Sequence, residues 1–155
     1  MIKTRYITEV AVIAALYAIL TILFAPISYG QIQVRISEIL TVLPFFTPAA
    51  IPGLFIGCIV ANFYGGIGII DIVFGSLATL IAAFLTCKMP KKVLAPLPPV
   101  VINALVVGFE LNIISGAPLV ATILWVGLGE ALACYALGYP VLLQLEKYKL
   151  RLFSR

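Results

Sequence analysis

The segment from Gln31 to Gly53 reads QIQVRISEILTVLPFFTPAAIPG, and it constrains how the rest of the chain can fold. It places Arg35 and Glu38 three residues apart in an otherwise apolar sequence. Three prolines then follow at intervals of four residues, at Pro44, Pro48 and Pro52. Charged side chains are costly at membrane depth and are usually kept there for a function. We therefore interpret this segment as one wall of a small-molecule site in a membrane protein.

Composition supports a membrane protein. The chain has 155 residues, of which 63% are hydrophobic and 10% charged, and its mean hydropathy is +1.20. A soluble domain of this size needs more polar surface. The formal net charge of +4 does not indicate nucleic acid binding, because the basic residues lie in short clusters beside apolar runs, as membrane topology requires. We expect an all-α integral membrane protein, multi-pass in the cell membrane, with a single domain over residues 1–155.

The three cysteines, Cys58, Cys87 and Cys134, show no CxxC spacing, and the chain contains no histidine. A disulfide framework and a metal site both need closer groupings of such residues. We therefore expect buried thiols that pack as small apolar side chains, and neither a metal nor a cofactor.

The apolar runs set the expected spans. The first, residues 7–25, is long enough for a membrane helix of roughly 20 residues, with Glu9 paired to Arg5 one turn earlier. No charge lies between Glu38 and Asp71. One helix over that stretch would be about 48 Å long against a hydrocarbon core of about 30 Å, so the prolines must divide it. The expected spans lie near residues 7–25, 36–46, 49–64, 69–86, 98–114 and 118–143.

The basic clusters test this count. They are Lys3 with Arg5, the Lys88–Lys92 loop, and the tail from Lys147 to Arg155. Basic residues concentrate in cytoplasmic segments, so an even number of spans must separate successive clusters. Four spans and then two satisfy this requirement. We expect six transmembrane helices with both termini in the cytoplasm.

With that topology, most polar side chains of the spans fall in the outer half of the membrane. Ionised groups in apolar surroundings need partners, so their convergence indicates a site for a polar ligand. The substrate-binding candidates are Arg35, Glu38, Asn62, Asp71, Asn103, Glu110, Trp125 and Glu130.

Several candidates have an alternative interpretation. Asp71 beside a glycine turn is equally explained as a solvated helix-end residue, and Asn62 as a group that satisfies a helix terminus. Trp125 suits an interfacial aromatic belt. Arg35 and Glu38 can also form a simple surface ion pair.

Small residues repeat on two of the expected helices, and such stripes let helices approach closely in lipid. In the third span we attribute the stripe Gly53, Gly57 and Ala61 to packing within the protein. In the first span the alternative is docking onto another membrane subunit. The candidate docking residues are Ala11, Ala14, Ala15 and Ala18.

The segment QVRISEILTVLPFFTPAAIPGLFIGCIVAN, Gln33 to Asn62, resembles the signature of the QueT family, and the likeness in size and span plan extends over the chain. That family comprises substrate-binding S components of energy-coupling-factor (ECF) transporters in bacterial cell membranes. The resemblance implies an S-component-like bundle that captures a queuosine precursor from outside, a 7-deazaguanine such as queuine or its aminomethyl precursor. It also implies docking, through the first helix, onto a membrane coupling subunit that carries two cytoplasmic ATPase subunits.

The residues fit this substrate class. A carboxylate such as Glu110 or Glu130 can accept adjacent N–H donors of a guanine-like edge, and Trp125 or Tyr64 can stack on the ring. Glu38 or Asp71 suits a cationic aminomethyl group, and Asn62 and Asn103 can complete the edge. Three alternatives stay open: an S component for another vitamin-like molecule, a solitary carrier or channel, and an intramembrane hydrolase. The last is disfavoured because histidine is absent and every lysine is expected near the cytoplasmic side.

Overall fold

The computed structural model describes residues 2–29 and 34–152, and within these ranges the regular structure is entirely helical. The long segments agree with the expected all-α architecture. The elements are α1 (Ile2–Leu23), α2 (Ala25–Ser28), η1 (Ile36–Phe45), α3 (Ala50–Gly65), η2 (Asp71–Gly75), α4 (Ser76–Cys87), η3 (Lys92–Leu94), α5 (Leu97–Ser115), α6 (Leu119–Ala131), η4 (Leu132–Gly138) and α7 (Tyr139–Leu152).

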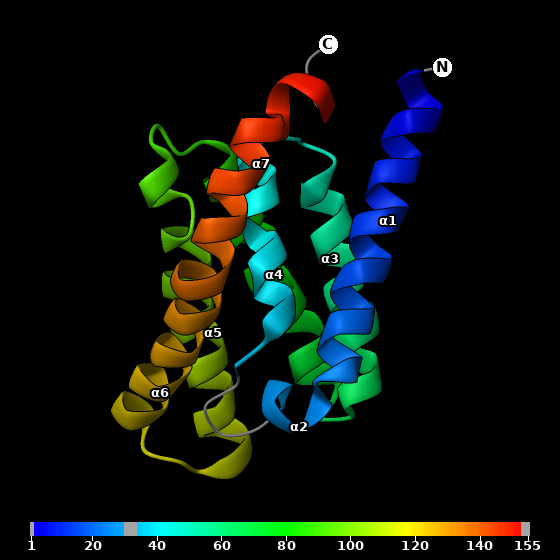
Figure 1. Ribbon diagram of the computed structural model, residues 1–155. Coiled ribbons are helices and arrows are strands. Elements are labelled where there is room, and N and C mark those ends of the chain that lie inside the picture. Colours follow the sequence, from blue (N-terminus) through cyan, green and yellow to red (C-terminus); the bar gives the residue numbers. More distant parts are fainter. Residues whose placement is uncertain (1, 30–33, 153–155) are drawn as a thin grey trace.

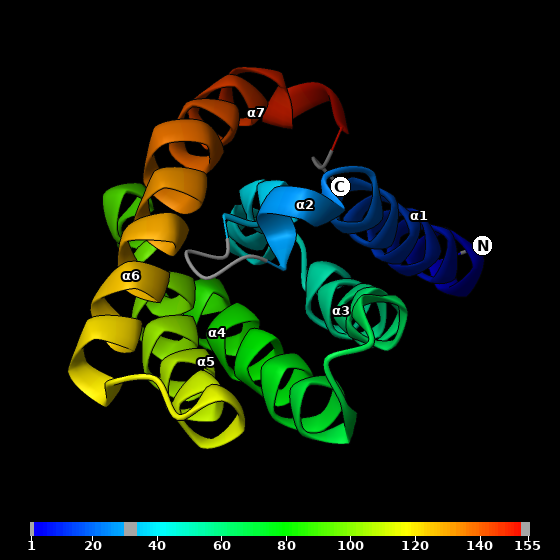
Figure 2. The same ribbon diagram turned by 90° about the horizontal axis from the view of Figure 1, so that it is seen from below.

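The helices form a ring around η1. Viewed along the bundle, α1, α3, α4, α5, α6 and α7 follow one another around a central η1, with α2 across one end (Figure 2). The start of α1 and the end of α7 lie at the same end of the bundle (Figure 1). An ion pair between Lys92 and Glu146 joins the segment after α4 to α7. The beginning of α1, this segment and α7 therefore carry their basic residues at one end of the bundle, which we call the basic end, whereas Arg35 lies in the interior.

The central segment η1 is a 3₁₀ helix of 10 residues, about 20 Å long, which is unusually long for this type of helix. Pro44 lies inside it and has no N–H to donate. Ser37, Glu38, Thr41 and Val42 are fully or almost fully buried, so surrounding helices hold the segment in place. The sequence predicted a short proline-broken helix here, and the structure shows why it tolerates this geometry: it packs inside protein, not against lipid.

Glycines end two of the surrounding helices. Gly66 after α3 has φ of 67° and Gly116 after α5 has φ of 68°, both left-handed. Each donates its N–H to the carbonyl of an asparagine in the last turn, Asn62 or Asn112. These left-handed residues satisfy a helix terminus and reverse the chain, as expected for glycine after a helix.

Three helical stretches are long and apolar enough to cross a membrane: Lys3–Leu23, Lys92–Ser115 and Leu119–Tyr148. Three further apolar helices are shorter, at Ile36–Phe45, Ala50–Gly65 and Asp71–Cys87. The shorter ones include η1 at the centre of the ring. The long stretch Leu119–Tyr148 is continuous through the π-helical segment η4.

The distribution of side chains is the reverse of that in a soluble protein. Large apolar side chains lie on the outside, with Phe63 at 76%, Val120 at 72% and Ile69 at 70% exposure. Charged and amide side chains lie inside, where Glu38 and Asn62 have no exposed surface. Soluble proteins rarely bury charges in this way, whereas helices surrounded by lipid do.

Close packing of α1 against α3 depends on two glycines. A Cβ at Gly57 would lie 2.7 Å from the carbonyl oxygen of Ala14, and one at Gly53 would lie 2.9 Å from Cβ of Ile13. No side chain fits at either position. These contacts agree with the expectation that Gly53 and Gly57, now seen to lie in α3, serve packing within the protein.

Candidate functional site

Glu38 is the innermost acid of the bundle and joins three elements. Its side chain, carried at the start of η1, accepts a short hydrogen bond from the Tyr17 hydroxyl of α1. On its other side lie Glu130 of α6 and Cys134 of η4, whose side-chain oxygen and sulfur atoms fall within 4.8 Å of those of Glu38. The Cys134 thiol lies 3.8 Å from Oε2 of Glu130 and 3.8 Å from the Glu38 carbonyl oxygen. Helices distant in sequence thus meet around one carboxyl group.

Arg35 pairs with Asp71. Nη2 of the guanidinium lies 3.6 Å from Oδ1 of Asp71, and both side chains are almost completely buried. The Arg35 guanidinium carbon also lies 5.8 Å from the centre of the Tyr29 ring, a cation–π distance. Arg35 and Glu38 therefore do not form the surface ion pair that was one interpretation of their spacing, because both side chains are buried and the ion pair of Arg35 is to Asp71.

Asn62 of α3 holds the start of η2, the turn that leads into α4. Its Nδ2 donates to the Asp71 carbonyl oxygen at 2.9 Å, at the first residue of the π-helical turn η2. Gly75 closes that turn, and a Cβ there would lie 2.8 Å from Nδ2 of Asn62 and 3.1 Å from Oδ1 of Asp71. The glycine thus leaves the space that these side chains occupy. Asp71 is 1% exposed, which corrects its interpretation as a solvated helix-end residue.

Asn103 and Glu110 lie on the same face of α5, two helical turns apart. The Glu110 carboxyl neighbours that of Asp71, and Asn103 neighbours Glu130. All four side chains are buried. The structure therefore brings seven of the eight substrate-binding candidates into the bundle interior. We call them the buried polar cluster: Arg35, Glu38, Asn62, Asp71, Asn103, Glu110 and Glu130.

Much of the hydrogen-bonding capacity in this cluster is unused among the described residues. Buried polar groups are normally paired, and each exception calls for an explanation. In this cluster the donors of a guanidinium lie close to the acceptor oxygens of carboxylates and amides. The buried atoms without a hydrogen-bond partner are Nε of Arg35, Nη2 of Arg35 (in ion-pair contact with Asp71 only), Oε2 of Glu38, Oδ1 of Asn62, Oδ2 of Asp71, Oδ1 of Asn103 and both side-chain oxygens of Glu110. Such a set suits a ligand that both donates and accepts hydrogen bonds.

The two aromatic candidates lie outside the cluster. Trp125 is 53% exposed and Tyr64 63% exposed, so neither is enclosed with the buried polar groups. Both lie on the apolar outer surface, as belt residues do. Stacking on a ligand within the cluster is therefore not supported for either ring.

The candidate docking alanines divide into two pairs. Ala11 and Ala15 are exposed on the outer side of α1. Ala18 is buried and Ala14 is partly buried, with the Ala14 carbonyl oxygen against Gly57 of α3. Only the first pair is available to another subunit.

Sequence reasoning did not identify Tyr17, Tyr29 or Cys134 as members of the site. A tyrosine in an apolar helix is a usable signal, because its buried hydroxyl needs a partner. Cys134 lies one helical turn after Glu130, so its place could be inferred once Glu130 was assigned. The Glu38, Glu130 and Cys134 donor atoms are near enough to hold a cation. We assign none, because Oε1 of Glu38 already accepts from the Tyr17 hydroxyl and the Cys134 thiol already contacts Oε2 of Glu130.

A protein-family model described as QueT transporter matches residues 7–147 of the chain. The chain belongs to the QueT transporter family. This membership confirms the resemblance carried by residues 33–62. Together with the apolar helices, it makes the chain a multi-pass cell-membrane protein of a transporter family, and an enzyme interpretation is set aside.

One curated relative is the queuosine precursor transporter QueT of Lactococcus lactis subsp. cremoris (strain MG1363). It is 42% identical over 81 residues, an alignment that covers 51% of this chain and 47% of that protein. The matched region thus spans about half the length of the curated relative. No solved structure matches the chain significantly.

Proposed function

We propose that this protein is the substrate-binding S component of an ECF-type transporter and that it captures a queuosine precursor from outside the cell for ATP-driven uptake. Family membership supports a transporter, and the name of the Lactococcus relative supports the substrate class. The buried polar cluster supports a substrate-binding role, because it gathers donors and acceptors without hydrogen-bond partners inside an apolar bundle.

The chemistry of a 7-deazaguanine suits this cluster. Its guanine-like edge presents adjacent N–H donors, and a carboxylate accepts two of them in charge-assisted hydrogen bonds. Both side-chain oxygens of Glu110 are unpaired, and Asn103 and Asn62 each offer an unpaired amide oxygen. The guanidinium of Arg35 supplies donors for the ring carbonyl. Among the buried charged groups described, four carboxyl groups accompany one guanidinium, which favours a ligand rich in N–H groups or carrying a cation.

In the proposed topology, six segments cross the membrane and both termini are cytoplasmic. The common position of the α1 start and the α7 end supports an even number of crossings (Figure 1). The basic end faces the cytoplasm by the preference of lysine and arginine for that side. The start of η1, where Arg35 and Glu38 lie, is then nearer the outside, as capture of an external substrate requires.

The energy for uptake comes from partners in this proposal. The sequence contains no GxxxxGK motif followed by serine or threonine, the loop that cradles nucleotide phosphates. A membrane coupling subunit with two cytoplasmic ATPases would supply the driving force, and the exposed Ala11 and Ala15 form the docking surface on α1. Small residues there let a partner helix approach closely.

Ligand identification tests the proposal most directly. The protein is purified in mild detergent, denatured, and the released small molecules are identified by mass spectrometry. Titration with queuine, with its aminomethyl precursor, with guanine and with unrelated vitamins then ranks the affinities. We expect a 7-deazaguanine to copurify and to bind most tightly. A different copurifying vitamin would transfer the S-component assignment to that substrate, and uptake by the lone chain in liposomes would replace it by a solitary carrier.

A further inference from the structure

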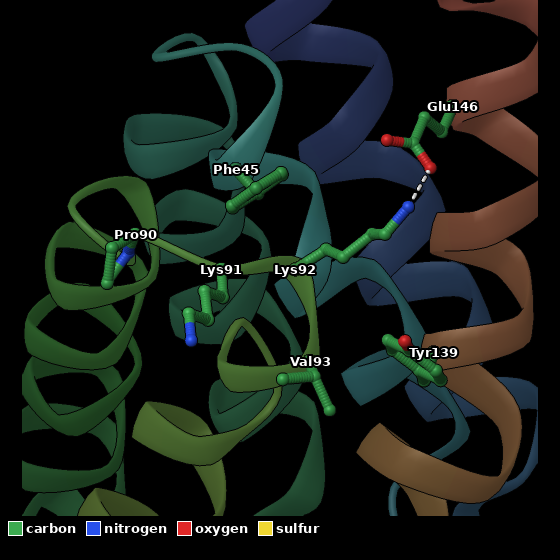
Figure 3. A pocket seen from close by; sticks show the side chains of 7 residues that line it. All are labelled: Phe45, Pro90, Lys91, Lys92, Val93, Tyr139 and Glu146. Carbon is green, nitrogen blue, oxygen red and sulfur yellow. Dashed lines mark hydrogen bonds and ion pairs between the residues drawn. The ribbon is translucent and has the colours of Figure 1, made fainter.

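A groove of about 460 Å³ lies at the basic end, at the opposite end of η1 from Arg35. Three segments form it: the end of η1, the segment that follows α4, and α7 (Figure 3). It is separate from the buried polar cluster and shares no residue with it. The residues that matter for its chemistry are Phe45, Lys91, Lys92, Val93, Tyr139 and Glu146.

The charges in the groove are unequal. Lys92 Nζ donates to Oε2 of Glu146 at 2.7 Å (Figure 3). An ammonium has three N–H donors, so Lys92 retains others for a ligand. No ion pair to Lys91 occurs within residues 2–29 and 34–152. Two lysines and one glutamate leave a single positive charge in excess, and a ligand with one negative charge matches it.

The position of the groove places it at the membrane surface. Lys92 begins the apolar stretch Lys92–Ser115, and Glu146 lies near the end of the stretch Leu119–Tyr148. Residues at such boundaries lie where hydrocarbon meets the headgroup layer. The apolar part of the lining is accessible, since Val93 is 47% exposed and the Phe45 and Tyr139 side chains face the groove (Figure 3).

We propose that this groove binds one anionic glycerophospholipid whose headgroup combines a phosphodiester with free hydroxyl groups. Lys91 and Lys92 contact the phosphate, as basic residues between membrane helices on the cytoplasmic side do for anionic lipids. Glu146 accepts a hydrogen bond from a headgroup hydroxyl, and the acyl chain passes Phe45 and Val93. A phosphodiester carries one negative charge and so matches the excess charge of the groove, whereas a phosphomonoester carries more.

Native mass spectrometry of the purified protein tests this site. The protein is mixed with phosphatidylglycerol or with phosphatidylcholine, and the lipid-bound fraction is measured for wild type, Lys91→Gln and Lys88→Gln. Lys88→Gln is the matched control, because it removes the same charge from the same segment, while the Lys88 ammonium lies 4.2 Å over the Phe84 ring and does not line the groove. We expect phosphatidylglycerol to be preferred and Lys91→Gln to weaken its binding about fivefold, the effect of one basic residue near an anionic lipid surface.

A second variant removes the acid of the groove, Glu146, and is expected to strengthen lipid binding instead of weakening it. Glu146→Gln leaves two positive charges, so it should increase binding of phosphatidic acid, whose phosphomonoester carries the higher charge. Millimolar inorganic phosphate should leave bound phosphatidylglycerol in place. The proposal is overturned by equal losses in Lys91→Gln and Lys88→Gln, by equal binding of the two starting lipids, or by displacement of the lipid with free phosphate, which would mark a phosphate site instead.

Discussion

The buried charged side chains of this protein lie close together, and the stability of the group depends most on Arg35. Its guanidinium lies beside Asp71 and the Tyr29 ring, and Glu38 follows one turn later. An isolated buried carboxylate is far less stable than a paired one, since water is excluded from it. The single guanidinium described in the interior therefore makes the cluster of acids tolerable within the bundle.

Replacing Arg35 should expose this dependence. We expect Arg35→Gln to lower the free energy of unfolding by about 3–5 kcal/mol, because it leaves the Asp71 carboxylate buried without its cation. Thermal or denaturant unfolding of the protein in detergent measures the change. The double variant Arg35→Gln/Asp71→Asn should recover part of the loss, since it also removes the unpaired charge. A double variant no more stable than Arg35→Gln alone would show that this pair is not the cause.

The acids on α5 and α6 allow a test of the proposed substrate contacts. Glu110→Gln and Glu130→Gln should each weaken binding of a 7-deazaguanine by about tenfold to a hundredfold, the value of a hydrogen bond to a charged group. Titration calorimetry in detergent measures the affinity. Glu9→Gln is the control, because Glu9 pairs with Arg5 near the start of α1, outside the cluster. Unchanged affinity in both interior variants would remove these acids from the site.

At the scale of elements, two kinds of irregularity shape the interior. π-helical turns at η2 and η4 contain Asp71 and Cys134, and such turns often occur at functional sites. Glycines permit close approach of helices at α1–α3 and of side chains at Gly75. Both features let helices or side chains lie closer to the centre of the bundle, where the polar groups meet around η1.

The α1–α3 contact can be tested with one methyl group. Gly57→Ala places a Cβ 2.7 Å from the Ala14 carbonyl oxygen, so α1 must shift, and we expect a loss of about 1–3 kcal/mol in unfolding free energy. Gly127→Ala on α6 is the matched control, because its new Cβ meets only the Ala104 methyl group at 3.3 Å. Thermal stability in detergent compares the two variants. Equal stability would mean that α1 and α3 are not held at this distance.

For the whole molecule, the natural cysteines give a test of topology. Cys58 and Cys134 are buried, whereas Cys87 is exposed at the end of α4 beside Lys88. A membrane-impermeant thiol reagent should therefore label Cys87 in inside-out vesicles and leave right-side-out vesicles unlabelled. Cys87→Ser is the control that removes the signal. Labelling from outside would place the basic end outside and invert the proposed orientation.

The proposed docking through α1 can also be tested on the whole molecule. Ala15→Trp adds bulk to the exposed side of α1, away from the buried polar cluster, so substrate affinity should stay unchanged while uptake in cells falls strongly. Binding is measured on the purified protein and uptake with a labelled precursor. Ala18→Trp is the contrasting variant: Ala18 is buried, so this change should destabilise the fold itself. If Ala15→Trp lost substrate binding but still assembled with its partner subunits, docking and capture would not be separate functions.

Comparison of sequence and structure shows which features each one determines. An all-helical membrane protein with a broken central segment could be predicted from composition, the basic clusters and the proline series in residues 31–53. This was possible because helix length and the cost of charge in lipid depend on local sequence. The motif in residues 33–62 was sufficient for the family.

Partnerships among the polar residues were decided only by the tertiary structure. Arg35 pairs with Asp71 from another helix, not with nearby Glu38, and Glu38 takes its hydrogen bond from Tyr17. Trp125 and Tyr64 point outward although their residue type suits stacking. Spacing along one helix predicts which side chains share a face, but which face turns inward depends on how all the helices pack. That packing brings polar residues of α3, η2, α5 and α6 together with those at the start of η1.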